Sequence, residues 1–181
     1  MSPTWIDRRC SEALVATLVV VALTVAGPTQ ADSARLTRES PWAAHVRTVD
    51  SALAARDIGA AERAWHAAYL AALGSWRWEG MVEVGDAAVR IGEASRLRQS
   101  ANAKARNLYV SALFRARQQD SLEGVLRVAE AFAALGDREV VAQCVRIALR
   151  LAAQDPEAQA DVRAFVARLG DPYFAAGQPG R

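Results

Sequence analysis

The chain is poor in the residues that support disulfides, metal sites and nucleophilic catalysis. Its 181 residues include only 2 cysteines, 2 histidines and one lysine, Lys104. Cys10 lies within residues 1–31, which are expected to be a cleaved secretory signal, so only Cys144 would remain in the mature chain, and one cysteine cannot form an internal disulfide. Cys144 shares a helical apolar stripe with Val141 and Ala148, which favours a small buried hydrophobe over a reactive thiol.

Motifs for cofactor binding or catalysis are also missing from the sequence. It contains no glycine-rich phosphate loop, no Gly-x-Ser-x-Gly elbow and no HExxH segment. His66 follows Glu62 by one helical turn, but a zinc site takes at least three ligands from the protein. We therefore expect no catalytic, cofactor-binding or metal site. Because carboxylates are plentiful, an all-helical cell-envelope enzyme of the cell-wall lytic type is kept as an alternative.

The charged residues do not form a block of one sign. The 22 basic and 20 acidic residues are mixed along the chain, and the formal net charge is +2. Nucleic-acid-binding proteins concentrate lysine and arginine on one segment or face, so we expect no nucleic-acid partner.

No segment alternates β-branched and polar residues between turn residues, so nothing predicts a sheet. Hydrophobic residues make up 52% of the chain and charged residues 23%, a composition that excludes disorder and allows a packed core. Alanine, leucine, arginine and glutamate are strong helix formers, and they are abundant here. The composition predicts an all-α fold.

Residues 1–31 have the order of a secretory signal. Arg8 and Arg9 precede an uncharged apolar run over residues 13–26, and small residues precede a cleavage site after Ala31. A membrane span needs about 20 apolar residues, so this run is short for one. We expect a secreted or periplasmic protein. The alternative is an inner-membrane anchor formed by residues 13–26, and only then would the chain contact a membrane.

Seven helical segments are expected over residues 40–170, after a linker at 32–39 and before a tail at 171–181. Gly136 suits a left-handed helix end, and Asp155 followed by Pro156 is typical of a helix start. Asp120 and Glu123 match a capping box. The expected helices begin near Ser40, Ile58, Trp78, Ser100, Asp120, Asp137 and Pro156.

The paired helices resemble the tetratricopeptide repeat, a helical hairpin defined by residue size. The segment 123–153 has the large-large-small-large pattern of the first helix on Val125, Val128, Ala129 and Phe132. Two further units match in part, through Gly85 with Tyr109 and through Trp65. About eight extra residues near 92–99 separate the halves of the middle unit. The resemblance implies a right-handed α-solenoid of three antiparallel hairpins, closed by a C-terminal capping helix.

In this family the first helix of each hairpin lines a concave groove. The positions that this implies combine carboxylates with apolar side chains, offset only by Arg90. They are Asp50, Asp86, Glu130, Glu79 and Glu123, with Val46, Val82, Leu126 and Val89. The resemblance implies a non-catalytic module that binds a protein or peptide with basic and apolar residues. A subunit that fills its groove with copies of itself is the other non-enzymatic alternative.

The segment Trp76-Arg77-Trp78 allows two interpretations. It could form a secondary, exposed aromatic-arginine patch of the kind found at interface hot spots. Alternatively, the two tryptophans pack on neighbouring helices and hold the turn between repeats.

Overall fold

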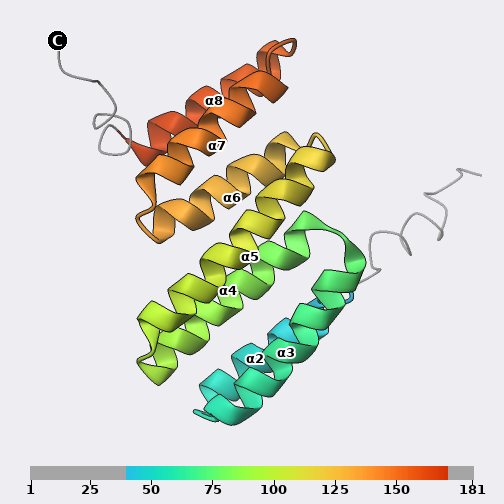
Figure 1. The fold of residues 1–181 in the computed structure, drawn as a ribbon, viewed down its shortest axis with the longest axis vertical. Coiled ribbons are helices and arrows are strands. Elements are labelled where there is room, and N and C mark those ends of the chain that lie inside the picture. The colour runs from blue at the N-terminus through green and yellow to red at the C-terminus, as the bar shows by residue number, and fades with distance from the viewer. Residues whose placement is uncertain (1–39, 171–181) are drawn as a thin grey trace, which may run out of the picture. The chain divides into compact units, whose positions relative to one another are not determined.

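The computed structural model describes residues 40–170, which lie within the compact unit Glu39–Arg181. These residues form seven helices and no strand, which confirms the all-α prediction (Figure 1). None of these helices is long and apolar enough to cross a bilayer. The predicted signal, linker and tail lie outside the described residues. The helices are α2 (Ala43–Ala54), α3 (Ile58–Ser75), α4 (Trp78–Ser95), α5 (Arg98–Gln118), α6 (Leu122–Ala134), α7 (Arg138–Leu151) and α8 (Pro156–Leu169).

The contacts divide the helices into two sets. Turns of two to four residues reverse the chain, so each helix packs against the next one in sequence. The even-numbered helices also pack on one another, α2 on α4, α4 on α6 and α6 on α8. We call the surface of α2, α4, α6 and α8 the even-helix side, and the surface of α3, α5 and α7 the odd-helix side.

Most turns contain one residue in the left-handed conformation. Gly136 has a φ of 80°, as its sequence context predicted. Arg56, Trp76, Arg96 and Asp120 have φ values between 48° and 61°, although a side chain disfavours this conformation. Tertiary packing and the backbone hydrogen bonds of the turns therefore hold residues that local preference alone would not place there.

The predicted start of α6 is wrong in detail. Ser121, and not Asp120, caps this helix, because its Oγ accepts a hydrogen bond from the backbone N–H of Gly124 at 3.0 Å. α5 begins two residues before the expected Ser100. The extra residues of the middle unit lengthen α4 and α5, which have 18 and 21 residues, and form no long loop.

Glycines in α4 and α6 allow these helices to pack closely against their neighbours. A Cβ at Gly85 would overlap the ring of Tyr109, so α4 and α5 approach closely at this glycine. A Cβ at Gly124 would lie 2.9 Å from the indole of Trp78. This second approach brings α6 against the start of α4 and places Trp78 between the two helices.

Candidate functional site

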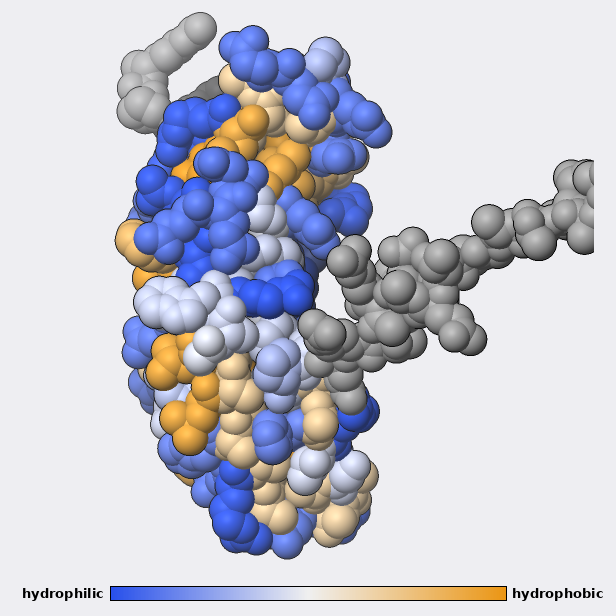
Figure 2. All heavy atoms as spheres, turned by 90° about the vertical axis from the view of Figure 1, so that its right-hand side faces the viewer, coloured by the Kyte–Doolittle hydropathy of each residue, from blue (hydrophilic) through white to orange (hydrophobic). Residues whose placement is uncertain are grey.

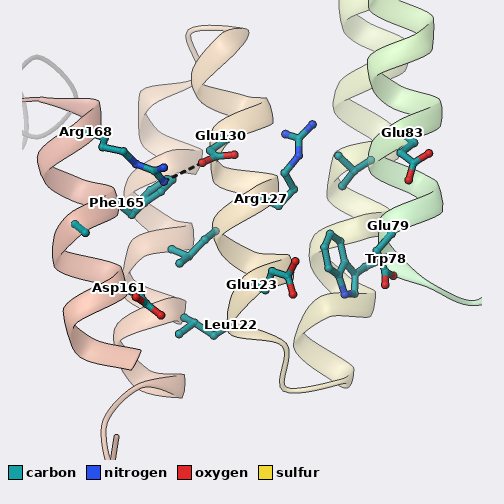
Figure 3. Close-up of a pocket in the computed structure, with 13 residues that line it drawn as sticks. Trp78, Glu79, Glu83, Leu122, Glu123, Arg127, Glu130, Asp161, Phe165 and Arg168 are labelled. Carbon is teal, nitrogen blue, oxygen red and sulfur yellow. Dashed lines mark hydrogen bonds and ion pairs between the residues drawn. The ribbon is translucent and has the colours of Figure 1, made fainter. Parts of the chain in front are cut away.

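A groove of about 650 Å³ lies between α4, α6 and α8 (Figure 3). Its floor is apolar: Val82 and Phe165 are almost fully buried, and Leu122 and Leu126 are half-buried. Trp78, 7% exposed, completes the floor on the α4 side. The floor therefore offers shallow apolar contacts from three different helices.

Carboxylates outnumber guanidinium groups around this groove. Five acidic side chains line it, against two arginines, Arg127 and Arg168. The acids come from all three helices, as Figure 3 shows: Glu79 and Glu83 from α4, Glu123 and Glu130 from α6, and Asp161 from α8. The groove consequently has a negative net charge.

Three of these carboxylates are available to a ligand. Arg168 pairs with Glu130 at 3.0 Å, and Glu79 pairs with Arg77. Within residues 40–170, the other three acids have no hydrogen-bond or ion-pair partner in the structure. These are Glu83, Glu123 and Asp161. In addition, Oε2 of Glu79 is buried without a hydrogen-bond partner among the described residues. Cationic or hydrogen-donating groups would satisfy these oxygens.

The three carboxylates predicted to form an acidic row are each paired with an arginine of the next even-numbered helix. Asp50 of α2 accepts from Arg90 of α4 at 2.9 Å, and Glu130 of α6 accepts from Arg168 of α8. Asp86 of α4 pairs in the same way with an arginine of α6. The prediction that Arg90 alone offsets the row is therefore wrong. Long arginine side chains reach across because the even-numbered helices lie against one another.

The carboxylate of Asp86 is held by hydrogen bonds within the protein. Its Oδ1 accepts a hydrogen bond from the Tyr109 hydroxyl at 2.7 Å, and its Oδ2 accepts one from Arg127. Burial raises the pKa of Tyr109 well above its ordinary value, and the Asp86 carboxylate raises it further. Since both oxygens are engaged inside the protein, Asp86 ties α4 to α5 and α6 and offers little to a ligand.

The structure brings together about half of the predicted site. Glu79, Val82, Glu123, Leu126 and Glu130 all line the groove. The remaining predicted positions do not line it, and they are Val46, Asp50, Asp86, Val89 and Arg90.

Sequence reasoning missed the contribution of α8, because this helix was treated only as a cap. Asp161, Phe165 and Arg168 line one wall of the groove. Glu83 was also missed, although it follows Glu79 by one helical turn and so shares its face. The spacing of four residues was the signal that could have found it.

The predicted aromatic patch does not exist as a continuous surface. Trp78 is buried in the groove floor, whereas Trp76 is 72% exposed. The Arg115 guanidinium lies 5.5 Å from the centre of the Trp76 ring, and Arg77 lies over the ring of Trp42. The packing interpretation is correct for Trp78, and Trp76 belongs to a different surface.

Both histidines are exposed, and no group of three or more His, Cys, Asp or Glu side chains within residues 40–170 is arranged to hold a metal ion.

Comparison with known proteins adds no family to this geometry: no protein-family model, no curated protein and no solved structure matches the chain.

Proposed function

We propose that this chain is an exported, tetratricopeptide-like interaction module that binds a segment of another protein, without catalysis. The observation that carries the proposal is the groove, where an apolar floor is bordered by three carboxylates, Glu83, Glu123 and Asp161, that form no hydrogen bond or ion pair with a described residue. Its volume lies within the range of about 300–1,000 Å³ that is common for ligand sites. The expected ligand is a segment with lysine or arginine beside apolar anchors.

The packing of the helices supports a solenoid of three hairpins, α2–α3, α4–α5 and α6–α7, with α8 as the closing helix. In such an array the first helices of successive hairpins pack on one another, as the even-numbered helices do here. In the proposed arrangement α8 also supplies a wall of the groove, through Asp161 and Phe165. The closing helix would therefore help to select the ligand.

The charges of the groove set the expected affinity and its salt dependence. Glu83, Glu123 and Asp161 border the groove from three helices, so a helical or extended segment could meet all of them. Partly exposed carboxylates guide encounter and discriminate between ligands more than they add affinity. Apolar contacts with the half-buried Leu122 and Leu126 would supply most of the binding energy. Affinity for a basic segment should consequently fall as ionic strength rises.

The test is a selection of peptides from a random library displayed on phage. The selected peptides are then synthesised, and their affinities for the protein are measured. The test variant is Glu83→Lys/Glu123→Lys/Asp161→Lys. A matched control reverses three exposed acids outside the groove, in Glu62→Lys/Glu93→Lys/Glu139→Lys. Both variants must show the circular dichroism and melting of the wild type.

We expect the selected peptides to be enriched in basic and apolar residues. They should bind the control with wild-type affinity and bind the groove variant at least roughly ten-fold more weakly, the equivalent of about 1.4 kcal/mol. Selected peptides without basic residues would refute the proposed site. So would selected peptides that bind the groove variant and the control variant with equal affinity.

A further inference from the structure

The exposed large hydrophobic side chains are confined to the odd-numbered helices and their ends. Within residues 40–170, every large apolar side chain with high exposure lies on α3, α5, α7 or a residue directly flanking α3 or α5. Trp76 is 72% exposed, Leu70 65% and Phe114 61%. The full set is Leu70, Leu73, Trp76, Leu97, Val110, Phe114 and Leu149. Single exposed apolar residues are ordinary, but their concentration on one set of helices needs an explanation.

Charge is divided between the same two sets of helices. The odd-numbered helices contain nine basic and two acidic residues, a net charge of +7. The even-numbered helices contain five basic and nine acidic residues, a net charge of −4. α5 alone has five basic residues and no acidic one. As a set, the helices that expose apolar side chains are therefore basic, through α5 and α7, whereas α3 has one arginine and one glutamate.

Internal contacts hold part of the exposed apolar set together. Arg115 of α5 donates to the carbonyl oxygen of Leu73, and its guanidinium covers the ring of Trp76. Gln119, which directly follows α5, donates to the carbonyl oxygen of Trp76 at 3.1 Å. These bonds bring the C-terminal end of α5, which carries Phe114, to the C-terminal end of α3, where Leu73 and the following Trp76 lie. In Figure 2 hydrophobic side chains gather in surface patches between strongly hydrophilic ones.

Exposed arginines lie next to these apolar side chains. Arg117 follows Phe114 by three residues on α5, and Arg146 and Arg150 flank Leu149 on α7. All three arginines are exposed, and no described residue forms an ion pair with any of them in the structure. Their guanidinium groups are thus free to meet anions outside the protein.

We infer that the odd-helix side docks on the surface of an anionic lipid bilayer. Tryptophan and phenylalanine favour the interface between headgroups and acyl chains, and leucine side chains add apolar insertion. Arginine binds lipid phosphates, and each basic residue near an anionic surface strengthens attachment. A bilayer accepts protruding side chains without a matching shape, whereas a folded acidic protein would need a surface complementary to them. The protein then lies on the membrane, with the groove on its other helices uncovered.

The experiment uses the full chain with one fluorescent label at a time. In a Cys10→Ser background, an environment-sensitive nitrobenzoxadiazole label is attached at Asn107→Cys, on the same stripe of α5 as Phe114. The control position is Thr48→Cys on α2, which is also exposed. Cys144 is fully buried and should not react. The fluorescence of each label depends on its own depth in the bilayer. Attachment of the chain to vesicles through the apolar run at residues 13–26 therefore does not by itself make the labels at positions 107 and 48 respond differently.

With vesicles of phosphatidylglycerol and phosphatidylcholine, the label at position 107 should shift to the blue, brighten and be quenched by a lipid-borne quencher. The label at position 48 should not respond. The response at 107 should be lost in Leu70→Ser/Phe114→Ser and in Arg117→Gln/Arg146→Gln/Arg150→Gln, and should be absent with pure phosphatidylcholine.

Three results would overturn the inference. The first is equal responses at positions 107 and 48, and the second is no response at 107. The third is a response at 107 to a soluble acidic polymer such as polyglutamate but not to anionic vesicles, which would indicate an acidic protein partner. The groove variant Glu83→Lys/Glu123→Lys/Asp161→Lys should dock like the wild type, so failure of this inference is distinguishable from failure of the proposed peptide site.

Discussion

Arg115 should be a major stabilising residue, although it has no part in the groove. It is the buried charged residue among those described, and it reaches from α5 to the end of α3. Its guanidinium donates to the carbonyl oxygens of Ala72 and Arg77 at 3.1 Å and of Leu73 at 3.3 Å. The last carbonyls of a helix have no partner within the helix, and a cation near them is also favoured by the helix dipole.

The expected loss on Arg115→Met is smaller than the sum of the three bonds. A hydrogen bond to a charged group contributes about 1.5–3 kcal/mol. However, the Ser75 hydroxyl also donates to the carbonyl of Ala72 at 2.7 Å, and Leu73 is exposed enough for water to replace its donor. Burial lowers the pKa of Arg115, which shows that holding its charge is itself costly, and methionine removes that cost. We therefore expect Arg115→Met to lower the free energy of unfolding by about 2–3 kcal/mol.

Urea unfolding followed by far-ultraviolet circular dichroism measures this difference. The matched control is Arg117→Met, which removes an exposed arginine from the same helix and should change stability by less than about 0.5 kcal/mol. Arg115→Lys keeps the charge but loses the planar fork, so it should fall between the two. If Arg115→Met and Arg117→Met unfold at the same urea concentration, the hydrogen bonds from Arg115 to the end of α3 do not stabilise the fold, and the reasoning is refuted.

Three further predictions concern stability. Gly85→Ala should lower the melting temperature, since the added methyl overlaps a buried aromatic ring and overpacking costs about 1–3 kcal/mol. Gly74→Ala, with no atom within 4 Å of the new methyl, should raise it. Burial raises the pKa of the Cys144 thiol from 9.0 to about 11, so the folded chain keeps a proton that the unfolded chain loses. Stability should fall as pH rises from 9 to 11, and Cys144→Ala should flatten that fall in urea titrations; an unchanged slope would contradict it. Asp86→Asn should cost about 1–2 kcal/mol because it weakens two internal contacts, whereas Asp50→Asn, at a well-exposed pair, should cost less than about 0.5 kcal/mol; equal losses in urea unfolding would contradict this ranking.

The helices were predictable where their ends depend on local chemistry. Proline at 156 after an aspartate and glycine at 136 mark a start and an end that the structure reproduces. The left-handed residues Arg56, Trp76 and Arg96 carry no such signal, because an unstrained chain would avoid that conformation there. Contacts between helices decide these turns, and a single sequence does not display those contacts.

The site was predictable only in part, for a related reason. The groove positions implied by the tetratricopeptide resemblance include Glu79, Glu123 and Glu130, and all three line the groove. The arginine that neutralises Glu130 lies 38 residues further along the chain, on a helix whose angle no local pattern fixes. Long side chains and tertiary packing thus set which carboxylates remain available.

The two proposed surfaces follow from one feature of the helix order, because acidic residues concentrate on the even-numbered helices and basic residues on the odd-numbered ones. The basic helices α5 and α7 then pack against the acidic helices α4 and α6, while α2, α3 and α8 each contain equal numbers of acidic and basic residues. A basic segment is attracted by the groove and repelled by the odd-helix side, while an anionic bilayer has the opposite preference. Neither ligand competes for the surface of the other, so charge reversal in the groove should leave lipid docking intact. A chain with both activities would hold a basic protein segment at a membrane surface.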